Sequence, residues 1–213
     1  MRPLIKIDAA HLKGKYLGTN LLAVGMDANN QIIPLATGVA QGETVESWSW
    51  FLSKLKECIG ERDGFAIISD RHYTITIACQ TVFPRAFHGY YCRHLMMNCR
   101  LKSKKHKALF WKTCKAYLES DFQNAISEIR RLRPEAYRKL EDAGFDRWSR
   151  AYCPAKRYNY MTSNSAKTIN SLTKFVRNVP ITMLIEYYRE LIQRWFCEHR
   201  YNGEGNAVKG THV

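Results

Sequence analysis

The sequence of 213 residues lacks any run of about 18 apolar side chains, so no membrane-spanning helix is expected. It also lacks the apolar core of a signal peptide, because Lys6 and Asp8 interrupt its first segment. The seven cysteines are an odd number and include no C-x-x-C pair, which argues against a disulfide framework and a structural zinc site. They are therefore expected to be reduced thiols in the cytosol or nucleus. Neither a P-loop nor a dinucleotide-binding fingerprint occurs, which removes the usual nucleotide-binding signatures.

Acidic side chains are absent from residues 71–118, a stretch that holds 10 of the 33 basic residues. The net charge of the whole chain is +14, so most of the excess lies in this stretch. Such a one-sided field attracts polyanions, of which nucleic acid is the commonest large example. From charge alone, a solvated basic helix face that aids solubility remains an equal alternative. The apolar content of 46% and aromatic content of 12% exclude a disordered tail.

The order of apolar patterns predicts an α/β fold. Three strands joined by turns would form an antiparallel meander, and Pro34 indicates an edge strand or a bulge in the third. A mixed sheet covered by helices is the expected layering. The expected strands are residues 4–8, 19–26, 31–40, 65–70 and 87–91, and the expected helices are residues 45–59, 73–82, a basic region 93–140, 164–176 and a last helix opened by Pro180.

Two carboxylates end predicted strands. Asp8 follows a short apolar strand, and Asp70 follows the continuous apolar run of residues 65–69. Acids in these positions lie at the rim of a sheet, where open α/β sheets bind their ligands. If the two side chains meet, their repulsion favours a divalent cation, and hard oxygen ligands select Mg²⁺ or Mn²⁺. The alternative is that both acids serve only in turns or caps.

Five segments in register resemble the plant Mutator-like element (MULE) transposases. Their lengths are short, but their order along the chain is that of the family. The segments are IDAAHLKGKY at residues 7–16, ESWSWFL at 46–52, ISDR at 68–71, HGYYCRHLMMN at 88–98 and YMTSNSA at 160–166.

The resemblance implies an RNase H-like fold and a DDE-type transposase core. It implies a mixed five-stranded sheet flanked by helices, an all-helical insertion over about residues 103–145, and C-terminal helices. The core would span residues 1–200, followed by a polar tail of residues 201–213. In this family two aspartates and one glutamate hold catalytic Mg²⁺ or Mn²⁺ while water, and then a freed 3′-hydroxyl, attacks phosphodiester bonds. The two aspartates correspond to Asp8 and Asp70.

The sequence departs from the family pattern at two places. Lys167 occupies the position of the expected glutamate, which replaces a negative ligand by a positive group. Loss of one member of a catalytic unit commonly costs orders of magnitude in rate, and Glu186 or Glu190 are the nearest acids that could substitute. Tyr91 occupies the position of the family cysteine, with Cys92 adjacent and His94 retained, so the role of this C/H segment is open between metal binding and packing.

These observations predict the catalytic core of a Mutator-like DDE transposase in the nucleus, which binds DNA and is impaired in metal-dependent strand cleavage and transfer by Lys167. The alternative is a non-catalytic module that binds DNA or partner proteins, akin to domesticated transposase-derived plant transcription regulators. A cellular RNase H-type nuclease is a weaker possibility, because the helical insertion argues against it. Expected partners are DNA, a second copy of the chain, or transcription and transposase proteins, and no membrane. The predicted DNA-binding residues are Arg93, Arg100, Lys102, Lys104, Lys105, Lys107, Lys112 and Lys115.

Overall fold

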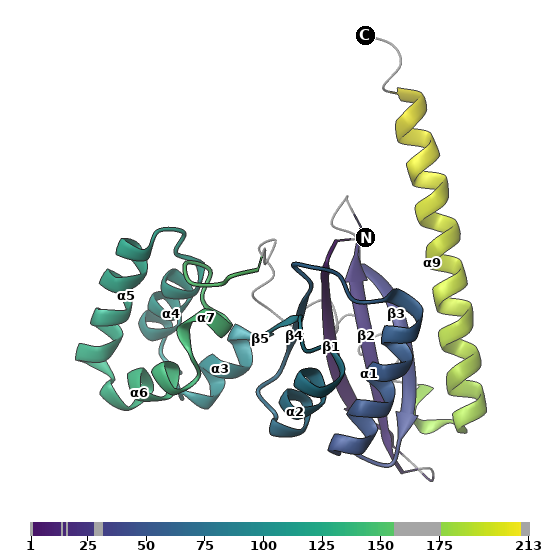
Figure 1. Ribbon diagram of the computed structural model, residues 1–213, viewed down its shortest axis with the longest axis horizontal. Coiled ribbons are helices and arrows are strands. Elements are labelled where there is room, and N and C mark those ends of the chain that lie inside the picture. The colour runs from purple at the N-terminus through teal and green to yellow at the C-terminus, as the bar shows by residue number, and fades with distance from the viewer. Residues whose placement is uncertain (1, 14, 16, 28–31, 156–175, 210–213) are drawn as a thin grey trace.

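The computed structural model describes residues 2–13, 15, 17–27, 32–155 and 176–209, with side chains up to residue 197. A five-stranded sheet organises the described part, in the order β3-β2-β1-β4-β5 (Figure 1). β1 pairs antiparallel with β2, which pairs antiparallel with β3, whereas β4 and β5 continue parallel to β1. The mixed five-stranded sheet confirms the predicted α/β fold class. The strands are β1 (Leu4–His11), β2 (Thr19–Met26), β3 (Ile32–Ala40), β4 (Ala66–Ser69) and β5 (Phe87–Tyr90).

Two helices cover one face of the sheet. The helix α1 (Val45–Ile59) begins at the N-cap Thr44, whose side chain accepts a hydrogen bond from the Ser47 amide at 3.1 Å. Its buried stripe packs with α2 (Tyr73–Val82) against alternate residues of β1, β2 and β4. The helical spacing of apolar residues in the sequence therefore identified the correct face of α1. The buried residues of that stripe are Trp48, Phe51, Leu52 and Leu55.

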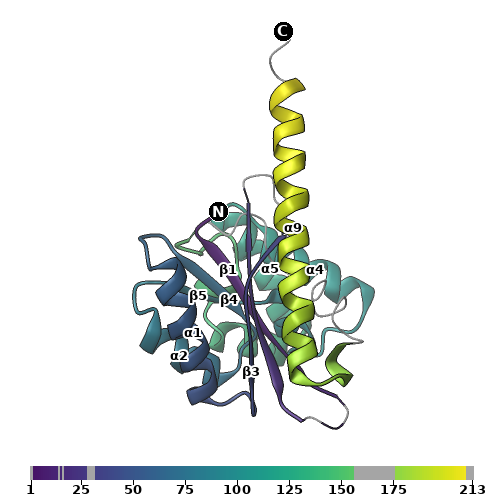
Figure 2. The same cartoon turned by 90° about the vertical axis from the view of Figure 1, so that its right-hand side faces the viewer.

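A long helix, α9 (Ile181–Lys209), covers the opposite face and extends beyond the sheet (Figures 1 and 2). It follows the short helix η1 (Val176–Asn178). Leu184, Tyr188 and Leu191 of α9 pack on Leu22 and its neighbours in the sheet. Among the described residues, no helix is both long enough and apolar enough to cross a membrane.

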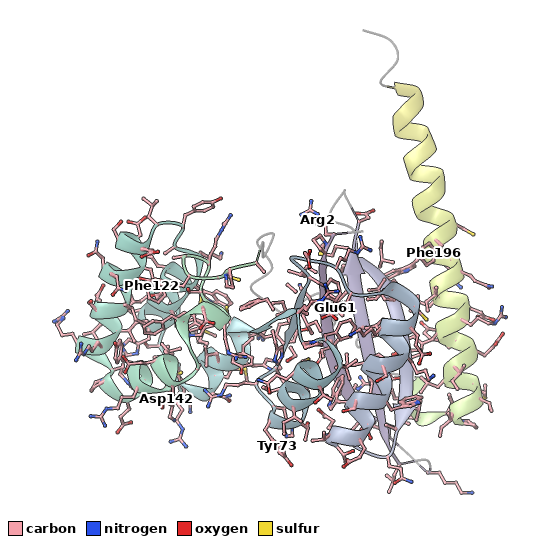
Figure 3. The ribbon with its side chains drawn as sticks, in the orientation of Figure 1. Arg2, Glu61, Tyr73, Phe122, Asp142 and Phe196 are labelled. Atoms are coloured by element: carbon pink, nitrogen blue, oxygen red, sulfur yellow. The ribbon has the colours of Figure 1, made fainter. Side chains whose placement is uncertain are left out.

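The helical insertion forms a lobe beyond β5 with a core of its own (Figure 1). Phe122, labelled in Figure 3, lies at its centre, and the rings of Phe110 and Trp148 stack with centroids 5.8 Å apart. The region is helical as predicted, but it is divided into five helices, because Arg100 has a left-handed backbone and Pro134 starts a new helix. They are α3 (Cys92–Asn98), α4 (Lys104–Lys115), α5 (Glu119–Leu132), α6 (Pro134–Asp142) and α7 (Phe145–Trp148).

Two local expectations have clear outcomes. Pro34 lies on the edge strand β3, and the β2–β3 register shifts beside it, between Ala23 and Val24, so the edge and the bulge are both confirmed. The helix α9 continues to Lys209, so residues 201–209 of the predicted polar tail are helical. No proline follows Pro180, so the sequence contains no residue that forces this helix to end earlier. The helix predicted at residues 164–176 lies almost entirely outside the described residues.

Candidate functional site

Asp70 directly follows β4, but β1 continues past Asp8 to His11, so the prediction that a strand ends on Asp8 is wrong. β1 and β4 are parallel, and the last pair between them is Lys6 with Ile68, so Asp8 and Asp70 each lie two residues beyond it. Because side chains alternate along a strand, both carboxylates point to the face opposite α1 and α2. The structure thus brings Asp8 and Asp70 together, whereas Lys167 lies outside the described residues.

The Tyr91 side chain interacts electrostatically with both Asp8 and Asp70. Its side chain is fully buried, and its hydroxyl donates a hydrogen bond to the Ile7 carbonyl at 3.0 Å. Burial raises the pKa of Tyr91 well above its ordinary value, and the negative charges of Asp8 and Asp70 raise it further. Both aspartates therefore act on the phenol of Tyr91.

The C/H segment divides between two cores. Tyr91 packs with Leu4, Ala66 and Ile68 of the sheet, so it has a packing role at the position where the family carries cysteine. Cys92 is buried in the helical lobe, and its thiol donates a hydrogen bond to the Trp148 carbonyl at 3.1 Å. His94 is half-buried, with its ring centroid 5.7 Å from that of Tyr91. Neighbouring residues thus point to opposite sides, as the extended backbone of Tyr91 requires.

The buried side chains of Ser69 and His88 fix the main chain at Asp70. The Ser69 hydroxyl donates to the Asp70 carbonyl at 2.6 Å, so Nε2 of His88 donates to the Ser69 oxygen at 2.8 Å. Burial lowers the pKa of His88 to about 4, and the positive charge of Arg147 acts in the same direction. His88 is therefore neutral at physiological pH and links Asp70 to β5.

Glu43 belongs to the same edge of the sheet, and the sequence analysis did not select it. It lies in the loop between β3 and α1. Burial raises the pKa of Glu43, and the charge of Asp70 raises it further, while His11 and His72 oppose the change. The signal that could have found it is the strand order, because the end of β3 adjoins the end of β1 through the start of β2.

Two of the ligands that a hard divalent cation requires are present at this edge of the sheet. Carboxylate oxygens of Asp8 and Asp70 are ligands of the type that Mg²⁺ and Mn²⁺ prefer. One oxygen of Asp70, Oδ1, is buried and has no hydrogen-bond partner among the described residues, so it is available to a ligand. No group of three His, Cys, Asp or Glu side chains suited to a metal ion occurs in the described ranges, so these residues provide two carboxylates.

Two adjoining hollows extend from Asp70 towards the helical lobe. The first has a volume of about 350 Å³ and contains Asp70, His72 and His94. The second, which we call the basic groove, has a volume of about 520 Å³ and lies along α3 and α4. Met97 lines both. The lining residues of the basic groove are Arg93, Met96, Met97, Arg100, Leu101, Lys102, Lys107 and Trp111.

The predicted DNA-binding residues divide into two groups. Arg93, Arg100, Lys102 and Lys107 line the basic groove. The others are exposed on α4 outside it, where the ammonium of Lys115 lies 5.9 Å from the ring centroid of Trp111. This second group comprises Lys104, Lys105, Lys112 and Lys115.

Comparison with known proteins finds similarity in the sheet-forming part of the chain. Residues 4–98 match the family model of the MULE transposase domain. Protein FAR1-RELATED SEQUENCE 6 of Arabidopsis thaliana is 29% identical over 93 residues, which are 44% of this chain and 13% of that protein. The chain therefore corresponds to a small part of this relative.

Solved structures of retroviral integrases are also similar. A chain of the simian T-cell lymphotropic virus intasome, in complex with PP2A regulatory subunit B56 gamma, matches with 16% identity and a TM-score of 0.33. The match covers 61% of this chain and 48% of that one. The HTLV-2 integrase catalytic core domain in complex with magnesium matches with 12% identity and a TM-score of 0.29. That match covers 55% of this chain and 88% of the integrase chain.

Proposed function

Residues 4–98 are a MULE-type transposase-derived domain, and from this premise we propose that the protein is a DNA-binding DDE transposase core impaired in strand cleavage. In this proposal the basic groove binds DNA, and the edge of the sheet that contains Asp8 and Asp70 receives a phosphodiester bond. The proposed core covers residues 1–200, includes the helical lobe, and works in the nucleus.

The observation that carries this proposal is the continuity of the two sites. Asp8 lies within β1 and Asp70 directly follows the neighbouring strand β4, and the hollow at Asp70 adjoins the basic groove through Met97. A strand whose phosphates contact the groove would therefore reach Asp70 without leaving the protein surface. Neither a cationic groove nor a carboxylate pair alone would place a bound phosphodiester next to acidic side chains.

Asp8 and Asp70 would hold Mg²⁺ or Mn²⁺, which in this class of chemistry stabilises charge on the attacking and leaving oxygens. Ser69 and His88 position the Asp70 backbone, and Tyr91 anchors β1 through the Ile7 carbonyl. Lys167 stands where the sequence pattern expects the third acid. An ammonium there would repel a cation and supply no ligand, so cleavage by this chain is expected to be weak.

A second candidate function is binding without cleavage. The similarity to Protein FAR1-RELATED SEQUENCE 6 favours it, since the family resemblance includes domesticated transcription regulators. In that case the groove would hold DNA, the carboxylates would serve no chemistry, and a second copy of the chain or a transcription or transposase protein would be the partner.

Strand cleavage and binding, measured on the same DNA, separate these functions. We expect the wild-type chain to bind labelled DNA but to nick it slowly in Mg²⁺. Lys167→Glu should increase nicking, and the double variant Lys167→Glu/Asp70→Asn should abolish that gain while binding is retained. If Lys167→Glu is as inactive as wild type and Mg²⁺ shifts the melting temperature of neither, the second candidate is correct. Fast Mg²⁺-dependent cleavage by wild type would refute the role given to Lys167.

A further inference from the structure

The basic groove has an unneutralised positive charge. Arg93, Arg100, Lys102 and Lys107 are exposed along it, and no acidic side chain lines it. Within the part of the chain that the structure describes, none of these four cations is in an ion pair. Cations that converge on one groove without acidic partners are suited to a chain of phosphates.

The backbone at Arg100 supports a ligand-binding role for this groove. α3 ends in a left-handed residue with a φ of 53°, the position in which helices usually carry glycine. A residue with a Cβ is disfavoured there. The sequence nevertheless has arginine, and its side chain lines the groove. Folding alone would be served at least as well by glycine, so the guanidinium is the feature that this position adds.

The groove also presents an aromatic surface among its cations. The ring of Trp111 is half-buried and packs edge-on against Phe110, with centroids 5.6 Å apart, so the lobe core fixes its orientation. Met97 is 63% exposed in the same groove, and the floor contains Leu101, which is 3% exposed. Duplex DNA exposes phosphates but keeps the faces of its bases stacked. An unpaired nucleotide offers both a phosphate and a free base face.

We propose that the basic groove binds a single-stranded DNA segment, with its cations on the phosphates and Trp111 stacked on a base. The segment would continue past Met97 to the hollow at Asp70, which places an unpaired strand next to that carboxylate. This inference rests on the proposed function, because it specifies the form of DNA that the same site receives.

Affinity measurements on matched DNA forms test the proposal. One labelled sequence is offered to the 213-residue protein as a single strand of about 12 nucleotides, a length within the usual site sizes of single-strand binders, as a blunt duplex, and as a duplex with an unpaired end. We expect tighter binding of the single strand and of the unpaired end than of the blunt duplex. Trp111→Leu should weaken single-strand binding by on the order of tenfold and leave duplex binding unchanged. Trp111→Phe keeps an aromatic ring and should retain the preference for the single strand over the duplex.

Salt dependence distinguishes stacking from charge. For the single strand, Lys107→Gln and Arg100→Gly should each reduce the slope of log affinity against log salt by about 0.7, whereas Trp111→Leu should leave it unchanged. Arg100→Gly suits the left-handed backbone, so its fold is retained. Arg131→Gln, an exposed cation on α5, and Tyr117→Ala, an aromatic side chain that is 72% exposed outside the groove, are matched controls expected to change neither quantity.

The possible failures are distinct. Equal affinity for the single strand and the blunt duplex, with no effect of Trp111→Leu in a folded protein, would overturn the single-strand proposal and leave DNA binding by the core intact. Absence of binding to every DNA form would overturn both proposals. Melting curves of each variant identify a loss of folding. If Trp111→Leu does not fold, Met97→Ser replaces it: it changes an apolar residue of the groove outside the lobe core and should weaken single-strand binding more than duplex binding.

Discussion

The buried histidine of β5 makes the protein sensitive to acid. The His88 side chain is 7% exposed, its Nε2 donates to Ser69, and its Nδ1 has no hydrogen-bond partner among the described residues. Burial and the charge of Arg147 lower the pKa of His88 from an ordinary value of 6.5 to about 4. The unfolded chain therefore binds a proton between these two values that the folded chain does not bind. The contribution of the neutral His88 side chain to the free energy of unfolding is therefore complete at neutral pH and is lost as the pH falls from about 6.5 to about 4.

The size of this effect follows from the two pKa values. One pKa unit corresponds to about 1.4 kcal/mol, so the folded state should lose about 3 kcal/mol through His88 alone. His88→Gln removes this titration and keeps an amide that can donate to Ser69. The difference in unfolding free energy between wild type and variant should therefore favour wild type at pH 7 and shrink by about 3 kcal/mol towards pH 4.

Urea denaturation monitored by tryptophan fluorescence across this pH range measures the difference. Arg147→Gln provides a second test, because removal of the positive charge that lowers the pKa of His88 should reduce the loss in acid. Parallel pH profiles for wild type and His88→Gln would refute the assignment of a neutral, buried imidazole behind Asp70.

Two other predictions concern the lobe and the sheet edge. Trp148 is fully buried and donates a hydrogen bond from Nε1 to the Leu140 carbonyl at 3.0 Å. Trp148→Ala should therefore lower the free energy of unfolding, measured by urea denaturation, by about 3–5 kcal/mol. A loss below about 1 kcal/mol would contradict the packing described for the lobe. Because the pKa of Glu43 is raised, the folded state loses stability as the pH rises through that pKa, and Glu43→Gln should raise the melting temperature at pH 7. The gain should disappear well below pH 4.5, the ordinary pKa of the group, and a gain that is constant with pH would exclude the electrostatic cause.

Much of the fold could be predicted because its signals are local. The period of apolar residues located α1 and its buried face, and the apolar runs before Asp8 and Asp70 indicated neighbouring strands, although β1 continues past Asp8 to His11. These features depend on side chains close together in the sequence. The breaks within the helical lobe were harder, since Arg100 carries no composition signal for a left-handed backbone.

The remaining site features depend on distant contacts. Glu43 approaches Asp70 only because the sheet order brings the end of β3 near the end of β1. His88 supports Asp70 through a hydrogen bond to a strand that precedes it by almost twenty residues. The packing role of Tyr91 likewise required the position of the Ile7 carbonyl. No periodicity in one sequence encodes such pairings.

The central claim is that Asp8 and Asp70 form one cation site that Lys167 weakens. A crystal of the Lys167→Glu variant soaked in Mn²⁺, with its anomalous difference map compared with that of identically soaked wild type, measures this directly. We expect a Mn²⁺ peak next to Asp8 and Asp70 in the variant and a weaker peak or none there in wild type. Equal peaks in both proteins would contradict the role of Lys167, and Mn²⁺ bound away from both aspartates would contradict the site itself.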